Sequence, residues 1–162
     1  TLFRTGINAE NMMITIGEEI EHVTAYIEIE KIRFRNQFDV QFNVEESLLQ
    51  EPMLKLLLQP LVENAINHGI REGNDFGHIF IFGQRFGKRI RFEVRDDGVG
   101  IPAEKLHVLQ KELASETSHA SVGIFNVHER IQLRYGAEYG LTIESTYGQG
   151  TRVLVEFPSL HS

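Results

Sequence analysis

The strongest constraint on the fold of this chain is the order in which two hydrophobic periodicities, of two and of about 3.6 residues, follow each other. Apolar patterns typical of strands occur over residues 38–44, 79–85, 89–94, 141–146 and 151–157. Helical spacing predicts helices over residues 17–35, 52–69, 103–113 and 123–135. The last four strands form two pairs, each joined by a short turn that contains glycine, so we expect two antiparallel hairpins. This order favours the α+β class, a two-layer α/β sandwich with a mixed, mostly antiparallel sheet.

The first predicted helix has one apolar stripe. The stripe consists of Ile16, Ile20, Val23, Ile27 and Phe34. Acidic residues lie in its first turns and basic residues in its last, which suits the helix dipole. A single stripe needs a partner, which is either the domain body or a second subunit. Residues 1–15 are polar and show no pattern, so we expect a frayed lead-in.

The second predicted helix begins at Pro52 and ends at Gly69, where a left-handed cap is expected. Its inner face carries Leu54, Leu57, Leu58, Leu61, Ala65 and His68. Pro60 lies inside this range, so the helix is expected to kink or to divide into two pieces. His68 is interpreted first as a hydrogen-bonded structural histidine.

Composition excludes several classes of function. The 162 residues carry a net charge of −7 without a dense run of Lys and Arg, which disfavours binding to nucleic acid. The absence of cysteine excludes disulfides, a thiolate nucleophile and cysteine-based metal sites. The glycine-rich loop of Walker-type phosphate binding is missing, and the histidines show no metal-ligand spacing. No stretch is long enough for a membrane span. Because the chain does not begin with Met, we expect a piece of a longer protein.

The segment Asp96-Asp97-Gly98-Val99-Gly100 follows the strand of residues 89–94. Strand parity puts Asp96 on the same face as Ile90, Phe92 and Val94, toward the apolar side of the sheet. A buried carboxylate needs hydrogen-bond donors, and the exocyclic amine of a purine is one candidate. Gly98 and Gly100 allow a sharp turn and a close approach to a ligand. The alternative is an ordinary turn after a strand.

A second candidate site lies on the helix before it, where Asn64 and Asn67 flank the apolar stripe and Glu63 lies further round the polar face. An amide oxygen beside a carboxylate suits Mg²⁺. A solvated polar helix edge is the alternative. Weaker signals come from the run Ser121-Val122-Gly123-Ile124, which leads into a helix whose free amides attract anions, and from Thr151 after a hairpin turn.

Taken together, these motifs resemble the ATP-binding domain shared by gyrase, Hsp90, histidine kinases and MutL. The segment Leu58-Gln59-Pro60-Leu61-Val62-Glu63-Asn64-Ala65 is similar to the asparagine box of LytS/YesM-type sensor histidine kinases. The runs of residues 18–34 and 126–131 are also similar to that subfamily. The resemblance covers the chain from about Glu18 to Pro158.

The resemblance implies a nucleotide site with two ends. Asn64 would coordinate Mg²⁺ between the ATP phosphates, and Asn64 and Glu63 are the candidate catalytic residues. Asp96 would accept the adenine amine. The full set expected to contact the nucleotide is Asn64, Asn67, His68, Asp96, Gly98, Gly100, Ile101, Ser121, Val122, Gly123, Ile124 and Thr151. Residues 101–122 correspond to the ATP lid. Ser121 replaces a family glycine and is expected to restrict lid closure or weaken nucleotide binding.

The resemblance also implies the activity, that of a protein-histidine kinase in a two-component system. Its phosphoacceptor histidine would lie upstream, because no acceptor motif occurs in this chain and His22 is in the wrong helix. Residues 1–35 would end a dimerisation region, leaving an apolar stripe without its mate, and residues 36–162 would form the catalytic domain. The expected partners are ATP, a response regulator and a second copy, with no nucleic acid. The location would be the cytoplasmic side of a bacterial membrane receptor.

Two alternatives remain. One is a degenerate nucleotide-binding or dimerisation module without catalysis. The other is an anti-sigma-type serine kinase or an ATPase. Relatives of that kind carry a glutamate that acts as the general base one turn before the metal-binding asparagine, and here Pro60 has that position.

Overall fold

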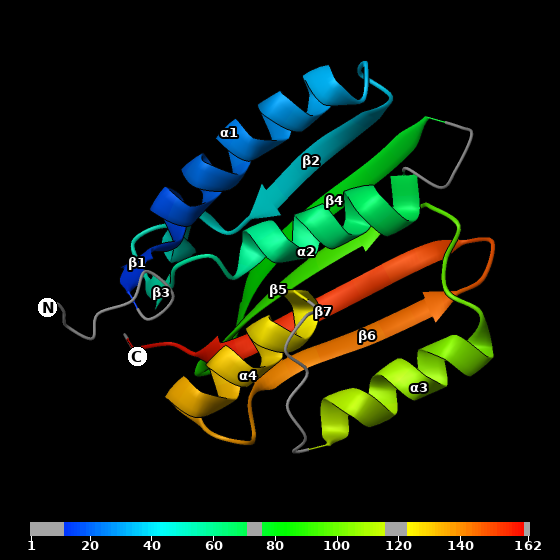
Figure 1. Ribbon diagram of the computed structural model, residues 1–162. Helices are drawn as coiled ribbons and strands as arrows, with labels where there is room; N and C mark the ends of the chain where they lie inside the picture. The colour runs from blue at the N-terminus through cyan, green and yellow to red at the C-terminus, as the bar shows by residue number, and fades with distance from the viewer. Residues whose placement is uncertain (1–11, 71–75, 116–122, 161–162) are drawn as a thin grey trace, which may run out of the picture.

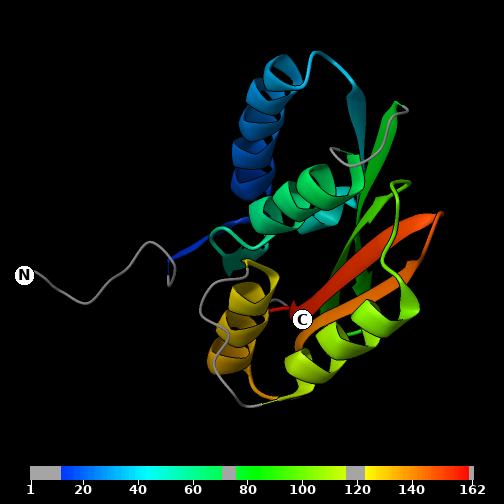
Figure 2. The ribbon, with the colours of Figure 1, turned by 45° about the vertical axis from the view of Figure 1, so that its right-hand side comes forward.

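The computed structural model describes residues 12–70, 76–115 and 123–160, in which the α-helices cover one face of a mixed sheet (Figures 1 and 2). The elements in order are β1 (Met13–Thr15), α1 (Ile16–Arg33), β2 (Phe38–Val44), η2 (Glu46–Leu48), β3 (Pro52–Leu54), α2 (Leu58–Asn64), η3 (Ala65–Ile70), β4 (Gly77–Phe86), β5 (Arg89–Asp96), α3 (Ala103–Ala114), α4 (Gly123–Tyr135), β6 (Gly140–Thr146) and β7 (Gly150–Pro158). No helix in these ranges is both long and apolar enough to cross a bilayer.

The main sheet has five strands in the order β2-β4-β5-β7-β6. Both predicted hairpins, β4–β5 and β6–β7, are confirmed as antiparallel pairs, and β5 also pairs antiparallel with β7. Strand β2 is parallel to β4, because the chain crosses over through α2 between these two strands. The predicted α+β architecture with a mixed, mostly antiparallel sheet is therefore confirmed.

The helix-covered face of the sheet is apolar. Ile90, Phe92 and Val94 of β5 are buried there, and Asp96 follows on the same face with 6% of its surface exposed. This confirms the parity argument for Asp96. The residues predicted to face inward from α4 are buried as well: Ile124, Val127 and Ile131.

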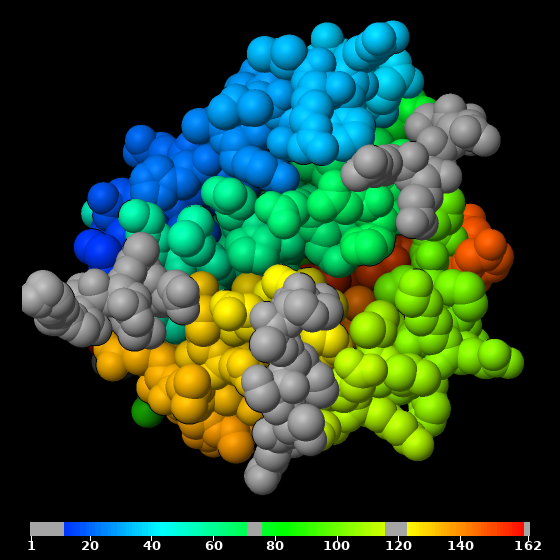
Figure 3. Space-filling model, in the orientation of Figure 1, coloured from blue at the N-terminus to red at the C-terminus, as the bar shows by residue number. Residues whose placement is uncertain are grey.

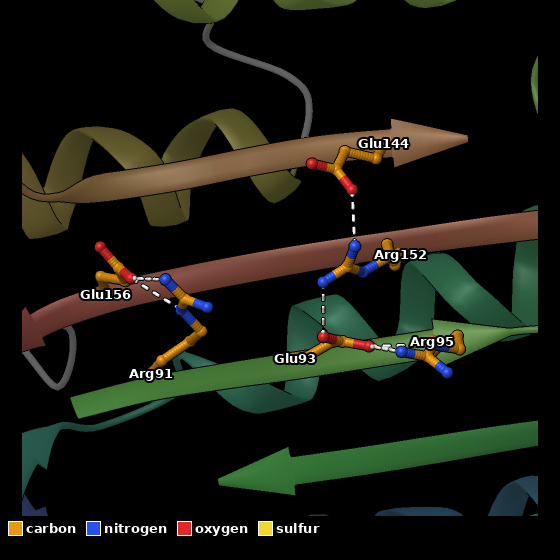
Figure 4. A network of polar contacts seen from close by, with 6 residues as sticks. All are labelled: Arg91, Glu93, Arg95, Glu144, Arg152 and Glu156. Atoms are coloured by element: carbon orange, nitrogen blue, oxygen red, sulfur yellow. Dashed lines mark hydrogen bonds and ion pairs between the residues drawn. The ribbon is translucent and has the colours of Figure 1, made fainter. Parts of the chain in front are cut away.

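The opposite face carries charged residues that pair with one another, and the helices lie behind the strands in this view (Figure 4). Arg152 on β7 contacts Glu93 on β5 at 3.0 Å and Glu144 on β6 at 2.8 Å. Arg91 and Glu156 form a further pair at 2.7 Å. Partly exposed ion pairs of this kind contribute about 1 kcal/mol or less each, so this face adds modestly to strand pairing.

The helix predicted from Pro52 begins only at Leu58, which corrects the expected start. Residues Pro52–Leu54 form β3, which pairs antiparallel with β1, so backbone hydrogen bonding to a distant segment overrides the local helical pattern. Pro60 then lies in the first turn of α2, where backbone N–H groups have no acceptor within the helix. The N–H that proline lacks therefore costs no helical hydrogen bond, and the predicted kink is not required. Gly69 does not adopt a positive φ, and the π-helical η3 runs through it to Ile70.

The start of α1 also differs from the expected patternless lead-in. Residues Met13–Thr15 form β1, and Thr15 caps α1 in a reciprocal arrangement with Glu18. The Thr15 hydroxyl accepts from the Glu18 backbone N–H at 3.1 Å, and the Glu18 carboxylate accepts from the Thr15 N–H at 2.9 Å. The spacing Thr-x-x-Glu is a sequence signal for this capping box, and it was missed.

The apolar stripe of α1 packs on the domain body. Ile16, Val23 and Ile27 are buried in the same hydrophobic core as the sheet and α2. Of the two partners that the stripe allowed, the structure therefore has the body. The expectation that the stripe is left without a mate is wrong, because the packed domain itself covers these side chains.

Candidate functional site

A cavity of about 570 Å³ opens beside α2 and α3, over the ends of β5, β6 and β7. Figure 3 shows the hollow between α2, α3 and α4, with atoms of β6 and β7 in orange and red at its floor. The lining residues are Asn64, His68, Gly69, Asp96, Val99, Gly100, Ile101, Pro102, Lys105, Leu109, Ile124, Ile143, Tyr147 and Thr151. This volume is in the range of small-molecule sites. The two residues on which the sequence analysis depends, Asn64 and Asp96, thus line one cavity.

Asp96 is the last residue of β5, in register with Ile79 of β4 and Thr151 of β7. Its Oδ1 accepts a hydrogen bond from the Gly98 N–H at 2.9 Å. Burial raises the pKa of the Asp96 carboxyl to about 6, and the nearby charge of Asp97 adds to the shift, whereas the amides of Gly98 and Thr151 oppose it. At pH 7 and above the cavity therefore holds a buried, ionised acceptor.

Two glycines make room for this carboxylate. A Cβ added to Gly69 would lie 2.6 Å from Oδ1 of Asp96, so the end of η3 must lack a side chain there. A Cβ on Gly98 would lie 2.3 Å from the Gly69 Cα. Only a capping role was predicted for Gly69 from the sequence, and its contact with the Asp96 carboxylate was missed. Its only sequence signal was a glycine near a helix end, which has many explanations.

The turn after β5 is held by the β6–β7 hairpin. Gly100 has φ +75°, and a Cβ on it would lie 2.3 Å from the Thr146 carbonyl oxygen, so this position requires glycine. The Ser145 hydroxyl accepts from the Ile101 N–H at 2.8 Å and lies 2.8 Å from the Thr151 hydroxyl. Ser145 was missed by the sequence analysis, although parity along its strand aligns it with the buried Ile143.

Asn64 ends α2, half-buried, and His68 lies exposed on η3 at the rim of the same cavity. The expectation of a structural, inward-facing His68 is therefore wrong, because the switch to a π-helix changes the angular spacing after Asn64. Asn67 is half-buried on η3 but does not line the cavity.

Glu63 is exposed and does not line the cavity. It lies close to α1, where burial raises the pKa of Tyr26 to about 12 and the charges of Glu30 and Glu63 add to that shift. The catalytic role of Glu63 stays a prediction.

The start of α4 closes another side of the site. Ile124 is buried and lines the cavity, while Gly123 is exposed, with Pro60 as its side-chain neighbour at 3.7 Å from an added Cβ. Ser121 and Val122 lie outside the described residues.

The cavity combines apolar walls with polar groups at separate places. Leu109, Ile124 and Ile143 are aliphatic, Asp96 and Thr151 lie at the strand ends, and Asn64 lies on the helix side. Lys105 is a cation in this lining that the sequence analysis did not identify. In the described part of the chain no group of three or more His, Cys, Asp or Glu could hold a metal ion. A single amide oxygen suits Mg²⁺, which keeps waters and phosphate oxygens as its other ligands.

Comparison with known proteins identifies two families that this chain matches. Residues 50–161 match the family of histidine kinase-, DNA gyrase B-, and HSP90-like ATPases, and residues 1–38 match the histidine kinase family. The sensor protein LytS of Bacillus cereus is 31% identical over 150 residues, which are 93% of this chain and 26% of that protein. The sensor histidine kinase BtsS of Escherichia coli K12 is 31% identical over 159 residues, 98% of this chain and 26% of that protein. The chain thus spans about a quarter of the length of these relatives.

The fold has close structural relatives too. The nucleotide-free catalytic domain of histidine kinase ThkA superimposes with a TM-score of 0.66 at 19% identity, covering 91% of this chain and 94% of that one. A sequence identity of 19% supports a shared fold and nothing further. The family match extends over more than half of the chain, from the β2–β3 connection to the end of β7. The chain therefore belongs to the family of histidine kinase-, DNA gyrase B-, and HSP90-like ATPases.

Proposed function

We propose that this chain is the catalytic ATP-binding domain of a LytS-type sensor histidine kinase, which binds Mg-ATP and transfers the γ-phosphoryl group to a histidine upstream. The observation that carries the proposal is the shared cavity of Asp96 and Asn64. The similarity to LytS and BtsS over more than nine-tenths of the chain supports the same function.

Adenine recognition rests on Asp96. Asp96 is 6% exposed and lies in the cavity lining, where its carboxylate would accept a hydrogen bond from the exocyclic amine of adenine. Guanine presents a carbonyl oxygen at the corresponding ring position, and two acceptors facing each other would leave a buried group without a partner. Thr151 is in register with Asp96 and lines the same cavity; its hydroxyl, 2.8 Å from the Ser145 hydroxyl, would complete the polar contacts.

Phosphate binding belongs to the helix side of the cavity. Asn64 would be the protein ligand of Mg²⁺, which neutralises charge on the phosphates when bound. Gly123 at the start of α4 would offer backbone amides beside His68 and Ile124, which line the cavity. Asn67, on η3 outside this lining, stays a predicted phosphate contact. In the transfer itself the bond from the β–γ bridging oxygen to the γ-phosphorus breaks, a bond from phosphorus to an imidazole nitrogen forms, and ADP leaves. Such a reaction needs mainly positioning and charge neutralisation from the protein.

The proposal extends to the whole protein. Residues 1–35 would belong to the region that carries dimerisation and the phosphoacceptor histidine, and residues 36–162 to the catalytic domain. A second copy, a response regulator and a membrane-bound sensor region would complete the system. The serine kinase and ATPase alternative is less suitable, because Pro60 lies one turn before Asn64 in α2 and cannot take a proton.

The test has two stages. Calorimetric titration of the chain with ATP in the presence of Mg²⁺ should show binding. A protein extended to include the upstream histidine should then acquire label from γ-labelled ATP as an acid-labile, alkali-stable phosphoramidate. Binding without transfer would favour the non-catalytic module, and an absence of ATP binding would overturn the proposal entirely.

A further inference from the structure

A buried carboxylate of α1 caps the helix that carries Asn64. Glu19 has 0% of its surface exposed, and its two oxygens accept from two backbone amides of a distant segment. Oε1 accepts from the Leu56 N–H at 3.0 Å and Oε2 from the Leu58 N–H at 3.1 Å. Leu58 is the first residue of α2, and the N-cap residue Leu57 makes no side-chain capping bond of its own. The capping group of α2 therefore comes from α1.

A buried guanidinium of α4 holds the other side of the same turn. Arg130 is 9% exposed, and it donates from Nη1 to the Leu56 carbonyl at 3.0 Å and from Nη2 to the Lys55 carbonyl at 2.6 Å. Leu56 has φ +63°, a left-handed conformation that is unfavourable for a residue with a side chain. Two buried charges of opposite sign thus hold residues 55–58 in a conformation that they would not adopt alone.

The distance from this turn to the proposed metal ligand is short. Helix α2 runs only from Leu58 to Asn64, so the capped end and Asn64 are about 9 Å apart at the usual helical rise. A short helix moves as one piece, and a shift of its first turn would displace Asn64. Asp96 is held separately, by strand pairing on both sides of β5.

We propose that Glu19 is a positioning residue for the metal end of the nucleotide site, through which α1 sets the placement of Asn64. This inference rests on the proposed function. Glu19 lies in the range that matches the histidine kinase family, residues 1–38, whereas the turn, Asn64 and Arg130 lie in the range 50–161 of the ATPase family. The position of α1 and the binding of Mg-ATP are then coupled, and the coupling is reciprocal.

The first test is Glu19→Gln, with Glu21→Gln as the matched control on the exposed side of the same helix. Glutamine keeps the shape but presents an NH₂ donor to an amide N–H that needs an acceptor. ATP affinity is measured with Mg²⁺ and with EDTA, and folding is checked by circular dichroism. We expect the affinity gained from Mg²⁺ to fall at least tenfold in Glu19→Gln, with metal-free ATP affinity within twofold of wild type. Glu21→Gln should change neither affinity.

The outcomes separate this inference from the proposed function. A wild-type chain that binds no ATP overturns both. If the wild type gains affinity from Mg²⁺ and folded Glu19→Gln gains the same, only the inference fails. An equal loss of both affinities would reduce Glu19 to a general structural role and also overturn the inference.

A second test uses the wild-type chain, so that it does not depend on the folding of a variant. Hydrogen exchange is followed at the Leu56 and Leu58 amides with saturating Mg-ATP and with saturating ATP plus EDTA. Reciprocal coupling predicts slower exchange at these two amides when Mg²⁺ is present. The Gly98 amide, bonded to Asp96, is the internal control and should be protected to the same extent in both conditions. Identical exchange at Leu56 and Leu58 in the two conditions contradicts the proposal.

Discussion

The two ends of the cavity are built in different ways. Asp96 ends a central strand, and the antiparallel register with β4 and β7 places it opposite Ile79 and Thr151. Asn64 ends a seven-residue helix, and the turn before that helix is held by side chains from α1 and α4. Many repeated backbone bonds position the first residue, and a few buried side-chain contacts position the second. We therefore expect a rigid nucleobase end and an adjustable metal end.

The largest effect is expected from a change at the rigid end. Asp96→Asn should weaken ATP binding by about 100-fold, roughly 3 kcal/mol, because the amide mispairs with a buried polar group of the ligand. Titration calorimetry with ATP and GTP measures this. The adjacent Asp97→Asn is the matched control, since Asp97 is exposed and paired with His78 at 2.7 Å. A wild-type chain that binds GTP as tightly as ATP would contradict the role given to Asp96.

A change at the adjustable end should have a smaller and more selective effect. Asn64→Ala should remove the contribution of Mg²⁺ to ATP affinity, about 30-fold or 2 kcal/mol, the size of one hydrogen bond or ligand contact to a charged group. Affinity in EDTA should stay unchanged, which makes the metal-free titration the control. If Mg²⁺ still strengthens binding in this variant, Asn64 is not the metal ligand.

Asp96→Asn should stabilise the fold although it weakens ATP binding. The pKa of this carboxyl is about 6 in the folded chain against an ordinary value of 3.8, so its ionised form destabilises the fold above pH 6. This cost is relieved as the pH falls from about 6 toward 4, because the folded state takes up the proton first. Asp96→Asn should raise the free energy of unfolding by about 1.5 kcal/mol at pH 8, below the upper limit that the shift allows. Urea unfolding at pH 8 and pH 4 checks this, and a gain of equal size at both pH values would contradict it.

The smallest effect is the dependence of wild-type binding on pH. The hydrogen bond to the adenine amine requires the ionised carboxylate. ATP affinity should therefore fall about tenfold between pH 7 and pH 5, because a group with a pKa of about 6 becomes mostly protonated over this range. Asp96→Asn should lack this component, so the difference between the two proteins isolates the titration of Asp96. Parallel pH profiles for both would assign the effect to other groups.

The rigid end was largely predictable from the sequence. Alternation along residues 89–94 continues to Asp96, and both hairpins follow from strand patterns joined by glycine turns. The adjustable end was predictable only in part. Helical spacing placed Asn64 beside an apolar stripe, but it gave the wrong start for the helix and the wrong orientation for His68. Residues 52–54 have a helical pattern and form a strand, since β1 offers them backbone partners.

The sequence by itself determined the local periods, the alternation of helices and strands, and the face on which Asp96 lies, because these depend on neighbours a few residues apart. Only the tertiary structure decided the parallel pairing of edge strand β2, the close packing of Gly69 against Asp96, and the hydrogen bonds of Glu19 and Arg130 to the turn before α2. These features join residues far apart in the chain. Their partners depend on the packing of the whole core, which a local pattern of residues does not predict.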